Sequence, residues 1–506
     1  MNVSFQSDPI RADGSDFIHF TTPVMTTIHT ILDQIRNAQT SEADKGTRFE
    51  ELVCQYLLNE PVYKEQFSDV WRWMDWPGRE GKPDTGIDLV AERNDGAGFV
   101  AIQCKCYASD TTIQKSHIDS FITASGKKGQ FVGRIIVSST PHWSKNAEDA
   151  IENQHPPVQR IDLNDLDAGV IDWSLYDVNK PKIKLKPKKT LRDHQKTALK
   201  QVRAGFETAD RGQLIMACGT GKTFTSLKIA EEHAGKGGMV LFLVPSLSLL
   251  SQTLREWTTE FAIPLHCYAV CSDTKIGKHD DSDPTTPDDL AIPATTNGKE
   301  LAENLLPSAV CNLPSKMTVV FSTYQSIDAI HVAQKHGVPE FDIIICDEAH
   351  RTTRARLEGE DESHFVRVHD NKFIKGKKRL YMTATPRLYS DDTKKKAKER
   401  EIPVWSMDDE NHFGKIFYYL GFSQAVSQGL LSDYKVVILG VDERYAVTTH
   451  KDSGIRNDPN DWCNEIDNER YIVDLIKRIV TLSVESVKII DGLPELVFFD
   501  KRKMDQ

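Results

Sequence analysis

Residues 212–223 read Gly-Gln-Leu-Ile-Met-Ala-Cys-Gly-Thr-Gly-Lys-Thr, and this stretch decides the fold of the larger part of the chain. An apolar strand runs into a glycine-rich turn, and a helical segment follows. The glycines let backbone N–H groups turn toward an anion at the start of that helix. A lysine and a threonine then supply a charge for phosphate and a hydroxyl ligand for Mg²⁺. We therefore predict an ATP phosphate-binding loop made by Gly219, Thr220, Gly221, Lys222 and Thr223.

A pair of carboxylates follows a second apolar strand, at Asp347 and Glu348. In a nucleotide-hydrolysing site the first carboxylate holds Mg²⁺ and the second positions the attacking water. We expect His350, two residues further on, to be an inter-lobe coupling residue rather than a metal ligand.

Strands and helices alternate from Leu191 onward, which is typical of a doubly wound parallel sheet. The longest apolar run, Met239–Val244, predicts a fully buried strand of that sheet. The segment 272–297 is rich in Asp, Thr and Pro and is expected to be a mobile loop. The other predicted strands are 212–216, 318–322, 342–346 and 379–382.

These motifs resemble those of superfamily 2 helicases and translocases between Leu191 and about Phe422. The resemblance implies that Gln195 reads adenine, that 244–246 and 322–326 contact nucleic acid, and that 383–385 couples hydrolysis to strand contact. Met216 departs from the pattern, since a glycine usually stands there. The resemblance further implies a second lobe that donates arginines to the γ-phosphate. We expect that lobe to be incomplete here, because no arginine-bearing motif follows Asp433.

A different arrangement of polar residues lies near the N-terminus. Asp88 begins one predicted strand, 87–91, and Gln103 and Lys105 lie on one face of the next, 99–105. Asn94-Asp95-Gly96 between the strands is a good hairpin turn, so the three side chains can converge. Phosphodiester hydrolysis needs a hard cation with oxygen ligands. We therefore predict Asp88 and Gln103 as Mg²⁺ ligands, Lys105 as the catalytic cation and Glu50 as a further carboxylate.

This arrangement resembles the PD-(D/E)xK nuclease fold in its Mrr-like form, over roughly residues 46–149. Gln103 departs from the wider family, in which an acidic residue is commoner. The alternative is a β-hairpin whose polar residues are simply solvated. Trp71, Trp73 and Trp76 fit core or edge packing better than a base-stacking platform.

The bulk properties are those of an ordinary globular protein. The chain has 506 residues, 27% of them charged, and a net charge of −11, which gives no overall attraction to nucleic acid. Nine cysteines without paired spacing indicate reduced thiols and no zinc site. No secretory signal and no membrane-spanning run is recognisable, so we expect a cytoplasmic protein without a membrane partner.

The order of nuclease then translocase resembles the N-terminal part of type ISP restriction–modification enzymes. Segments 381–387, 406–414 and 429–434 strengthen this resemblance. It implies double-stranded DNA as partner and a methyltransferase and target-recognition region, which is absent here and is expected to be encoded downstream.

We expect an α/β protein in which a PD-(D/E)xK nuclease domain precedes a RecA-like helicase lobe and a truncated second lobe. The function predicted is a Mg²⁺-dependent endonuclease with an ATP-dependent DNA motor. Two alternatives stay open: another helicase–nuclease of type IV restriction or DNA repair, and an inactive fragment that binds ATP or DNA. The predicted boundaries are an N-terminal helical segment 1–45, nuclease 46–165, basic linker 166–190, first lobe 191–425 and second lobe 426–506. The linker is interpreted as a solvated spacer or as a strap that faces DNA.

Overall fold

The computed structural model describes residues 27–38, 40–81, 83, 86–126, 129–152, 154–178, 183–272, 286–306, 315–355, 364–390, 395 and 404–432. The chain forms two compact units, residues 1–424 and 425–506. The predicted second lobe, from residue 426, lies outside the described residues beyond residue 432, so its fold stays a prediction.

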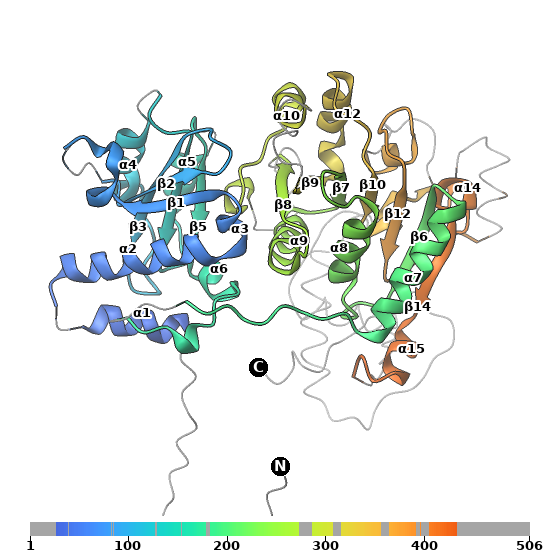
Figure 1. Ribbon diagram of the computed structural model, residues 1–506, viewed down its shortest axis with the longest axis horizontal. Coiled ribbons are helices and arrows are strands. Elements are labelled where there is room, and N and C mark those ends of the chain that lie inside the picture. Colours follow the sequence, from blue (N-terminus) through green and yellow to red (C-terminus); the bar gives the residue numbers. More distant parts are fainter. Residues whose placement is uncertain are drawn as a thin grey trace, which may run out of the picture. The chain divides into compact units, whose positions relative to one another are not determined.

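The N-terminal part is built on a five-stranded sheet in the order β1-β2-β3-β4-β5 (Figure 1). β1, β2 and β3 pair antiparallel, and β3, β4 and β5 pair parallel. The predicted hairpin is confirmed, because β2 and β3 pair across the Asn94-Asp95-Gly96 turn. The strands are β1 Phe67–Arg72, β2 Leu89–Arg93, β3 Phe99–Lys105, β4 Gly133–Ser138 and β5 Val158–Ile161.

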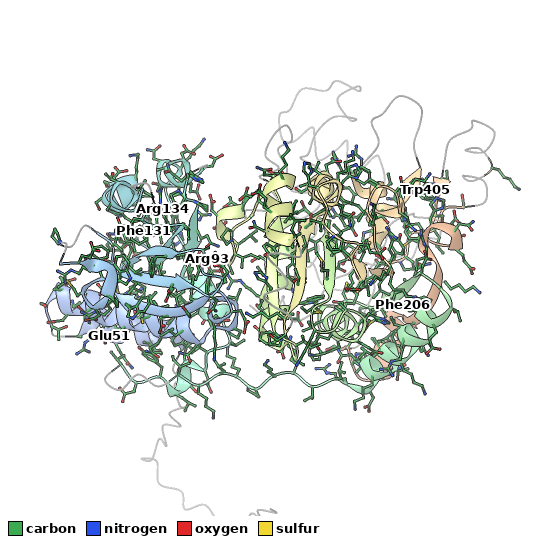
Figure 2. All side chains as sticks on the ribbon, turned by 45° about the horizontal axis from the view of Figure 1, so that its top comes forward. Glu51, Arg93, Phe131, Arg134, Phe206 and Trp405 are labelled. Carbon is green, nitrogen blue, oxygen red and sulfur yellow. The ribbon has the colours of Figure 1, made fainter. Side chains whose placement is uncertain are left out.

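Helices cover both faces of this sheet. Helix α2 (Glu42–Asn59) packs on β1 and β3, and its buried side chains recur at helical spacing. Helices α4 (Lys115–Ser125) and α5 (Lys145–Ile151) cover the other face together with Trp73 and Trp76. Trp76 also packs against Phe131, with ring centroids 6.0 Å apart. Phe131 is labelled among the side chains of this part in Figure 2. These two tryptophans are therefore core residues, as the sequence favours. The same part contains α1 Ile28–Asn37, α3 Pro61–Lys64, α6 Leu163–Ala168, η1 Trp73–Asp75, η2 Pro77–Arg79 and η3 Trp173–Leu175.

The larger part is built on a seven-stranded sheet in the order β14-β6-β12-β10-β7-β9-β8. All its neighbouring strands are parallel, so the predicted doubly wound parallel sheet is confirmed. The strands are β6 Arg211–Met216, β7 Met239–Val244, β8 Leu265–Val270, β9 Met317–Thr323, β10 Ile343–Cys346, β12 Arg379–Thr383 and β14 Lys415–Leu420.

Helices α8 (Lys222–His233) and α9 (Leu247–Glu260) lie on one side of this sheet, and α10 (Gly298–Leu305) and α12 (Ile327–Lys335) on the other (Figure 1). The α10 and α12 side forms an apolar cluster with β7, β10 and β12. Helix α7 (Asp193–Thr208) packs against α8, β6 and β14. The remaining elements are η4 Pro287–Asp289, η5 Tyr324–Ser326, η6 Ala349–Thr352, η7 His364–His369, β11 Arg354–Ala355, β13 Val404–Trp405, α14 Glu410–Phe413 and α15 Phe422–Ser427.

Edge strand β14 is fixed by an aromatic ring between two glycines. A Cβ atom at Gly205 of α7 would lie 2.3 Å from the Phe417 ring, and one at Gly212 of β6 would lie 2.2 Å from it. Pairing between β14 and β6 shifts register between Ile416 and Tyr418, around Phe417 itself. The ring therefore occupies the space that both glycines leave.

Two predictions for irregular segments change in the structure. The end of the acidic insert was expected to belong to a mobile loop, but residues 286–297 contain η4 and pack against β5 through Arg160 and Asp289, 2.7 Å apart. The described end of the basic linker is attached as well, because Leu185 pairs with Ile171 and the Lys188 ammonium donates to the Phe261 carbonyl at 2.7 Å.

Candidate functional sites

The predicted nuclease residues meet where β2 and β3 pair. Asp88 directly precedes β2, and its backbone N–H donates to the Ile102 carbonyl at 2.9 Å, which places it opposite Gln103. One Asp88 carboxylate oxygen accepts from the Cys104 backbone N–H at 2.6 Å. Side chains alternate between the two faces of a strand, so Gln103 and Lys105 lie on the same face of β3. The structure thus brings Asp88, Gln103 and Lys105 together.

Gln103 is the most informative of these side chains because it is buried, with only 2% of its surface exposed. Its amide nitrogen donates to the Gly86 carbonyl at 3.1 Å, which fixes the orientation of the amide. Its amide oxygen is buried and has no hydrogen-bond partner in the structure. An unpaired buried oxygen is costly, and a hard cation beside Asp88 would satisfy it. The donor set therefore fits a divalent metal that uses oxygen ligands.

Burial and neighbouring charges shift the pKa values of ionisable side chains at the end of β3. Burial lowers the pKa of Lys105, and the nearby Asp88 carboxylate opposes that shift. Burial raises the pKa of the Cys104 thiol, and Asp88 and Glu50 raise it further. Glu50 therefore lies near the same strand end, although it also lies 3.8 Å from the Arg72 guanidinium. This arginine was not part of the sequence prediction.

No group of three or more His, Cys, Asp and Glu side chains with the geometry of a metal site occurs in the part of the chain that the structure describes.

The phosphate-binding loop connects β6 to α8 at the carboxyl end of the sheet. Gly219 and Gly221 have φ of 80° and 84°, the left-handed region that favours glycine. Helix α8 begins at Lys222, so its free N–H groups face the loop. The Lys222 ammonium donates to the Met216 carbonyl at 3.3 Å, and the Thr220 hydroxyl donates to Ala217 at 2.6 Å. The loop thus has the cradle shape that its sequence predicts.

The start of α7 closes over this loop. The Gln195 amide oxygen accepts from the Arg192 backbone N–H at 2.9 Å, and its nitrogen donates to the Gly221 carbonyl at 3.3 Å. A ring nitrogen of His194 lies 2.9 Å from the Thr220 carbonyl oxygen. His194 was missed by sequence reasoning, although its position beside Gln195 was a usable signal. Two adjacent side chains therefore hold the loop from the same helix.

The carboxylate pair lies at the end of β10. Asp347 is buried, and burial together with the charge of Glu348 raises its pKa to about 6. Glu348 has φ of 46°, a left-handed conformation that costs a non-glycine residue energy and is common at functional sites. His350 lies 3.3 Å from the Glu348 carboxylate and 2.9 Å from the Thr383 hydroxyl, and its hydrogen bond lowers the pKa of Glu348. His350 thus contacts both a carboxylate of the pair and Thr383 of the 383–385 motif.

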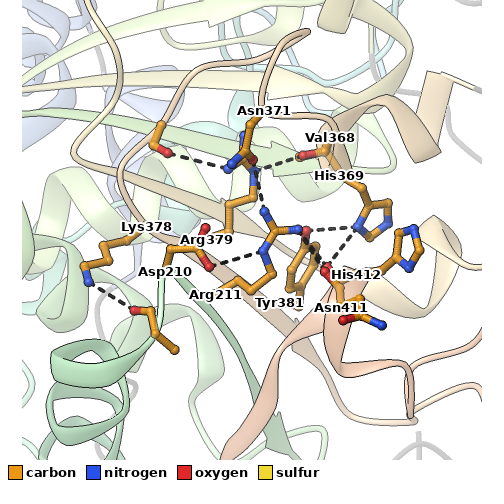
Figure 3. Close-up of polar contacts among 12 residues, drawn as sticks. Asp210, Arg211, Val368, His369, Asn371, Lys378, Arg379, Tyr381, Asn411 and His412 are labelled. Atoms are coloured by element: carbon orange, nitrogen blue, oxygen red, sulfur yellow. Dashed lines mark hydrogen bonds and ion pairs between the residues drawn. The ribbon is translucent and has the colours of Figure 1, made fainter.

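A buried polar network surrounds β12, the strand next to β10 (Figure 3). The fully buried Arg379 guanidinium donates to backbone carbonyls of Val368 and Ile374. His369 contacts the Tyr381 hydroxyl at 2.9 Å and the Thr352 carbonyl at 3.1 Å, and burial lowers its pKa to about 3. A neutral histidine therefore joins η6 to β12. Sequence reasoning did not find this network, because most of its partners are backbone atoms.

Two protein families match two separate ranges of the chain. Residues 58–183 match a family described as restriction endonuclease, and residues 188–388 match one described as type III restriction enzyme, res subunit. The chain therefore contains a part similar to restriction endonucleases and a part similar to the res subunit of type III restriction enzymes. Glu50 lies outside the first matched range.

Solved structures and curated proteins add particular relatives. The chain is similar to the ATP-dependent type ISP restriction–modification enzyme LlaBIII bound to DNA, with 39% identity and a TM-score of 0.71, over 92% of this chain and 29% of that one. A nuclease-deletion mutant of LlaGI, in complex with a DNA substrate mimic, is 44% identical with a TM-score of 0.38 over 48% and 21%. Probable helicase A859L of African swine fever virus is 33% identical over 48% of this chain and 23% of its own. The chain thus spans less than a third of these relatives. None of the described helices is long and apolar enough to cross a membrane.

Proposed function

We propose that the protein restricts DNA by combining a Mg²⁺-dependent endonuclease with an ATP-driven translocase that moves on double-stranded DNA. The observation that carries this proposal is the buried, unpartnered amide oxygen of Gln103 opposite Asp88. Such an oxygen is expected where a metal ligand is pre-positioned. A solvated hairpin, the alternative, would leave this amide in water.

In the nuclease site, Asp88 and Gln103 hold the divalent cation, which when bound supplies charge to stabilise the developing phosphorane. Lys105 faces the same point and orients the attacking water or neutralises the phosphate. Lys105 is partly buried, and this burial removes water from its ammonium group and lowers its pKa. Glu50 has an accessory role, because Arg72 shares its carboxylate.

In the motor site, the backbone N–H groups of residues 219–223 bind the phosphates of ATP, and Lys222 supplies the charge for the β and γ oxygens. Thr223 and Asp347 hold Mg²⁺. Glu348 positions the hydrolytic water, and His350 transmits its state to Thr383. Gln195, which lies against the loop at Gly221, reads the adenine.

DNA is the proposed partner of both sites, since the similar enzyme LlaBIII has been solved bound to DNA. Because the chain spans 29% of that enzyme, we propose that target recognition and methyl transfer depend on a region outside these 506 residues. A cytoplasmic location is part of the same proposal.

The test is nicking of supercoiled plasmid by the wild-type chain and by two matched lysine variants. Lys105→Ala is expected to abolish cleavage, and Lys222→Ala is expected to abolish only the part of cleavage that ATP stimulates. The nuclease assignment fails if Lys105→Ala cuts like the wild type in Mg²⁺.

A further inference from the structure

Helix α9 contacts the motor sheet with one face and the nuclease domain with the opposite face. Arg255 and Trp257 are two positions apart, and each residue of an α-helix turns by about 100°, so the two side chains leave opposite sides of the helix. Trp257 is fully buried toward β7 and β9, where its ring meets Phe242 and Phe321. Arg255 points the other way, toward the nuclease domain.

On the nuclease side, Arg255 forms an ion pair with Asp165 of α6, and both side chains are only about one-fifth exposed, at 21% and 22%. The Asp165 backbone carbonyl accepts a hydrogen bond from the buried Tyr56 hydroxyl of α2 at 3.3 Å. Glu60, which caps the end of α2, accepts from the Val170 backbone N–H at 3.0 Å and adds negative charge near Arg255. Arg255 is thus linked to the helix on which Glu50 lies.

On the motor side, α9 is attached to the helix of the phosphate-binding loop. The Trp257 indole N–H donates to the carbonyl of Thr223, in the first turn of α8, at 3.1 Å. Lys228 of α8 donates to the Glu260 carbonyl at 2.9 Å, at the end of α9. Thr223 is itself a residue that we assign to Mg²⁺·ATP. One helix therefore contacts both a nucleotide-site residue and the nuclease.

The link is stiff for an electrostatic reason. Both charges lie mostly out of water, so the loss of either partner would leave the other charge unpaired in a poorly solvated position. The nuclease is also held at a second place, where Arg160 of β5 binds Asp289 and the Gln159 amide donates to the Leu290 carbonyl at 2.8 Å. Because the nuclease domain is attached at two places, it cannot rotate freely when α9 shifts. A shift of α9 would instead change the forces on α2 and α6.

We infer that α9 carries the state of the nucleotide site to the nuclease domain, and that Arg255 is the positioning residue on which this transmission depends. This inference rests on the proposed function, since it assigns ATP to the loop and cleavage to the sheet end near Glu50. Nucleotide binding at Thr223 shifts Trp257, and Arg255 passes the shift to Asp165 and α2.

The test is hydrogen exchange of the full 506-residue chain with and without a non-hydrolysable ATP analogue and Mg²⁺. In the wild type, the analogue is expected to change exchange in peptides that cover α2 and α6. The variant Arg255→Met is combined with Asp165→Asn, so that no unpaired carboxylate remains at that position to unfold the protein. We expect this double variant to bind the analogue like the wild type and to lose the response in α2 and α6. Arg203→Gln is the matched control, because the exposed Arg203 pairs with Glu232 within the motor.

If the ion pair only stabilises the fold, the double variant will exchange faster in these peptides by the same amount with and without the analogue. The response to the analogue would then persist, and that result would overturn the inference. A wild type whose α2 and α6 peptides ignore the analogue would also overturn it. Failure of the proposed function appears separately, as a wild type that binds no nucleotide or cuts no plasmid.

Discussion

Replacing Gln103 by glutamate tests the metal role of the nuclease site most directly. The amide nitrogen that donates to the Gly86 carbonyl would become a second carboxylate oxygen, so a hydrogen bond would turn into a contact between two acceptors. The new charge would also be almost fully buried, at a position where the glutamine is 2% exposed. Without metal, the variant is expected to be less stable than the wild type.

The size of the loss follows from these contacts. The lost hydrogen bond is worth about 1 kcal/mol, and an uncompensated buried charge costs about 3–5 kcal/mol. Lys105 nearby and partial protonation offset some of this, which leaves a net loss of about 3 kcal/mol. At about 2–4 °C per kcal/mol, the Tm should fall by about 6–12 °C.

Thermal unfolding with and without Mg²⁺ measures the effect. A divalent ion at about 100 times its Kd adds about 2.7 kcal/mol to the folded state, so Mg²⁺ should restore most of the loss in Gln103→Glu. Gln103→Leu is the control, because it removes the ligand without adding a charge and should not respond to Mg²⁺. A metal-free glutamate variant as stable as the wild type would refute the reasoning, as would an equal metal response in the leucine variant.

Four further outcomes are expected. Lys105→Ala abolishes plasmid cleavage but leaves the affinity for a fluorescent ATP analogue unchanged; a loss of nucleotide binding would show that the sites are not separate. Lys222→Ala weakens binding of that analogue, because its ammonium is the main point charge on the phosphates; equal affinity contradicts this role. DNA binding weakens steeply with salt and depends little on sequence, since phosphate contacts dominate it; affinity that is flat in a salt titration argues against it. Burial raises the pKa of Asp165 to about 6, so the folded state binds more protons than the unfolded state between about pH 4 and 6. As the pH falls through 6, urea unfolding should show the wild type gaining stability relative to Asp165→Asn, and parallel pH profiles would exclude the shift.

The strands that sequence reasoning located best are those buried on both faces. Residues 239–244 were predicted with the bounds that β7 has, because an uninterrupted apolar run of that length fits a central parallel strand. Edge strand β14 was missed. Ile416 and Tyr419 are about half exposed, and the strand's place depends on its pairing with β6, which no local pattern encodes.

The site residues also differ in how far the sequence could predict them. Residues in short motifs, such as Lys222 and Asp347, could be predicted because their spacing along the chain fixes their geometry. The Arg72 neighbour of Glu50 and the Arg255–Asp165 pair could not, since they join residues that only the tertiary fold brings together. The unpaired oxygen of Gln103 is likewise visible only once its burial is known.

The ring of Phe417 between Gly205 and Gly212 has an evolutionary consequence. The three residues lie on three different elements, yet a methyl group at either glycine would overlap the same ring. While the phenylalanine is present, natural selection should reject alanine at both glycine positions. Once a smaller residue replaces the phenylalanine, both positions become free to vary. We therefore expect these three positions to covary among homologous chains, with the aromatic residue changing first.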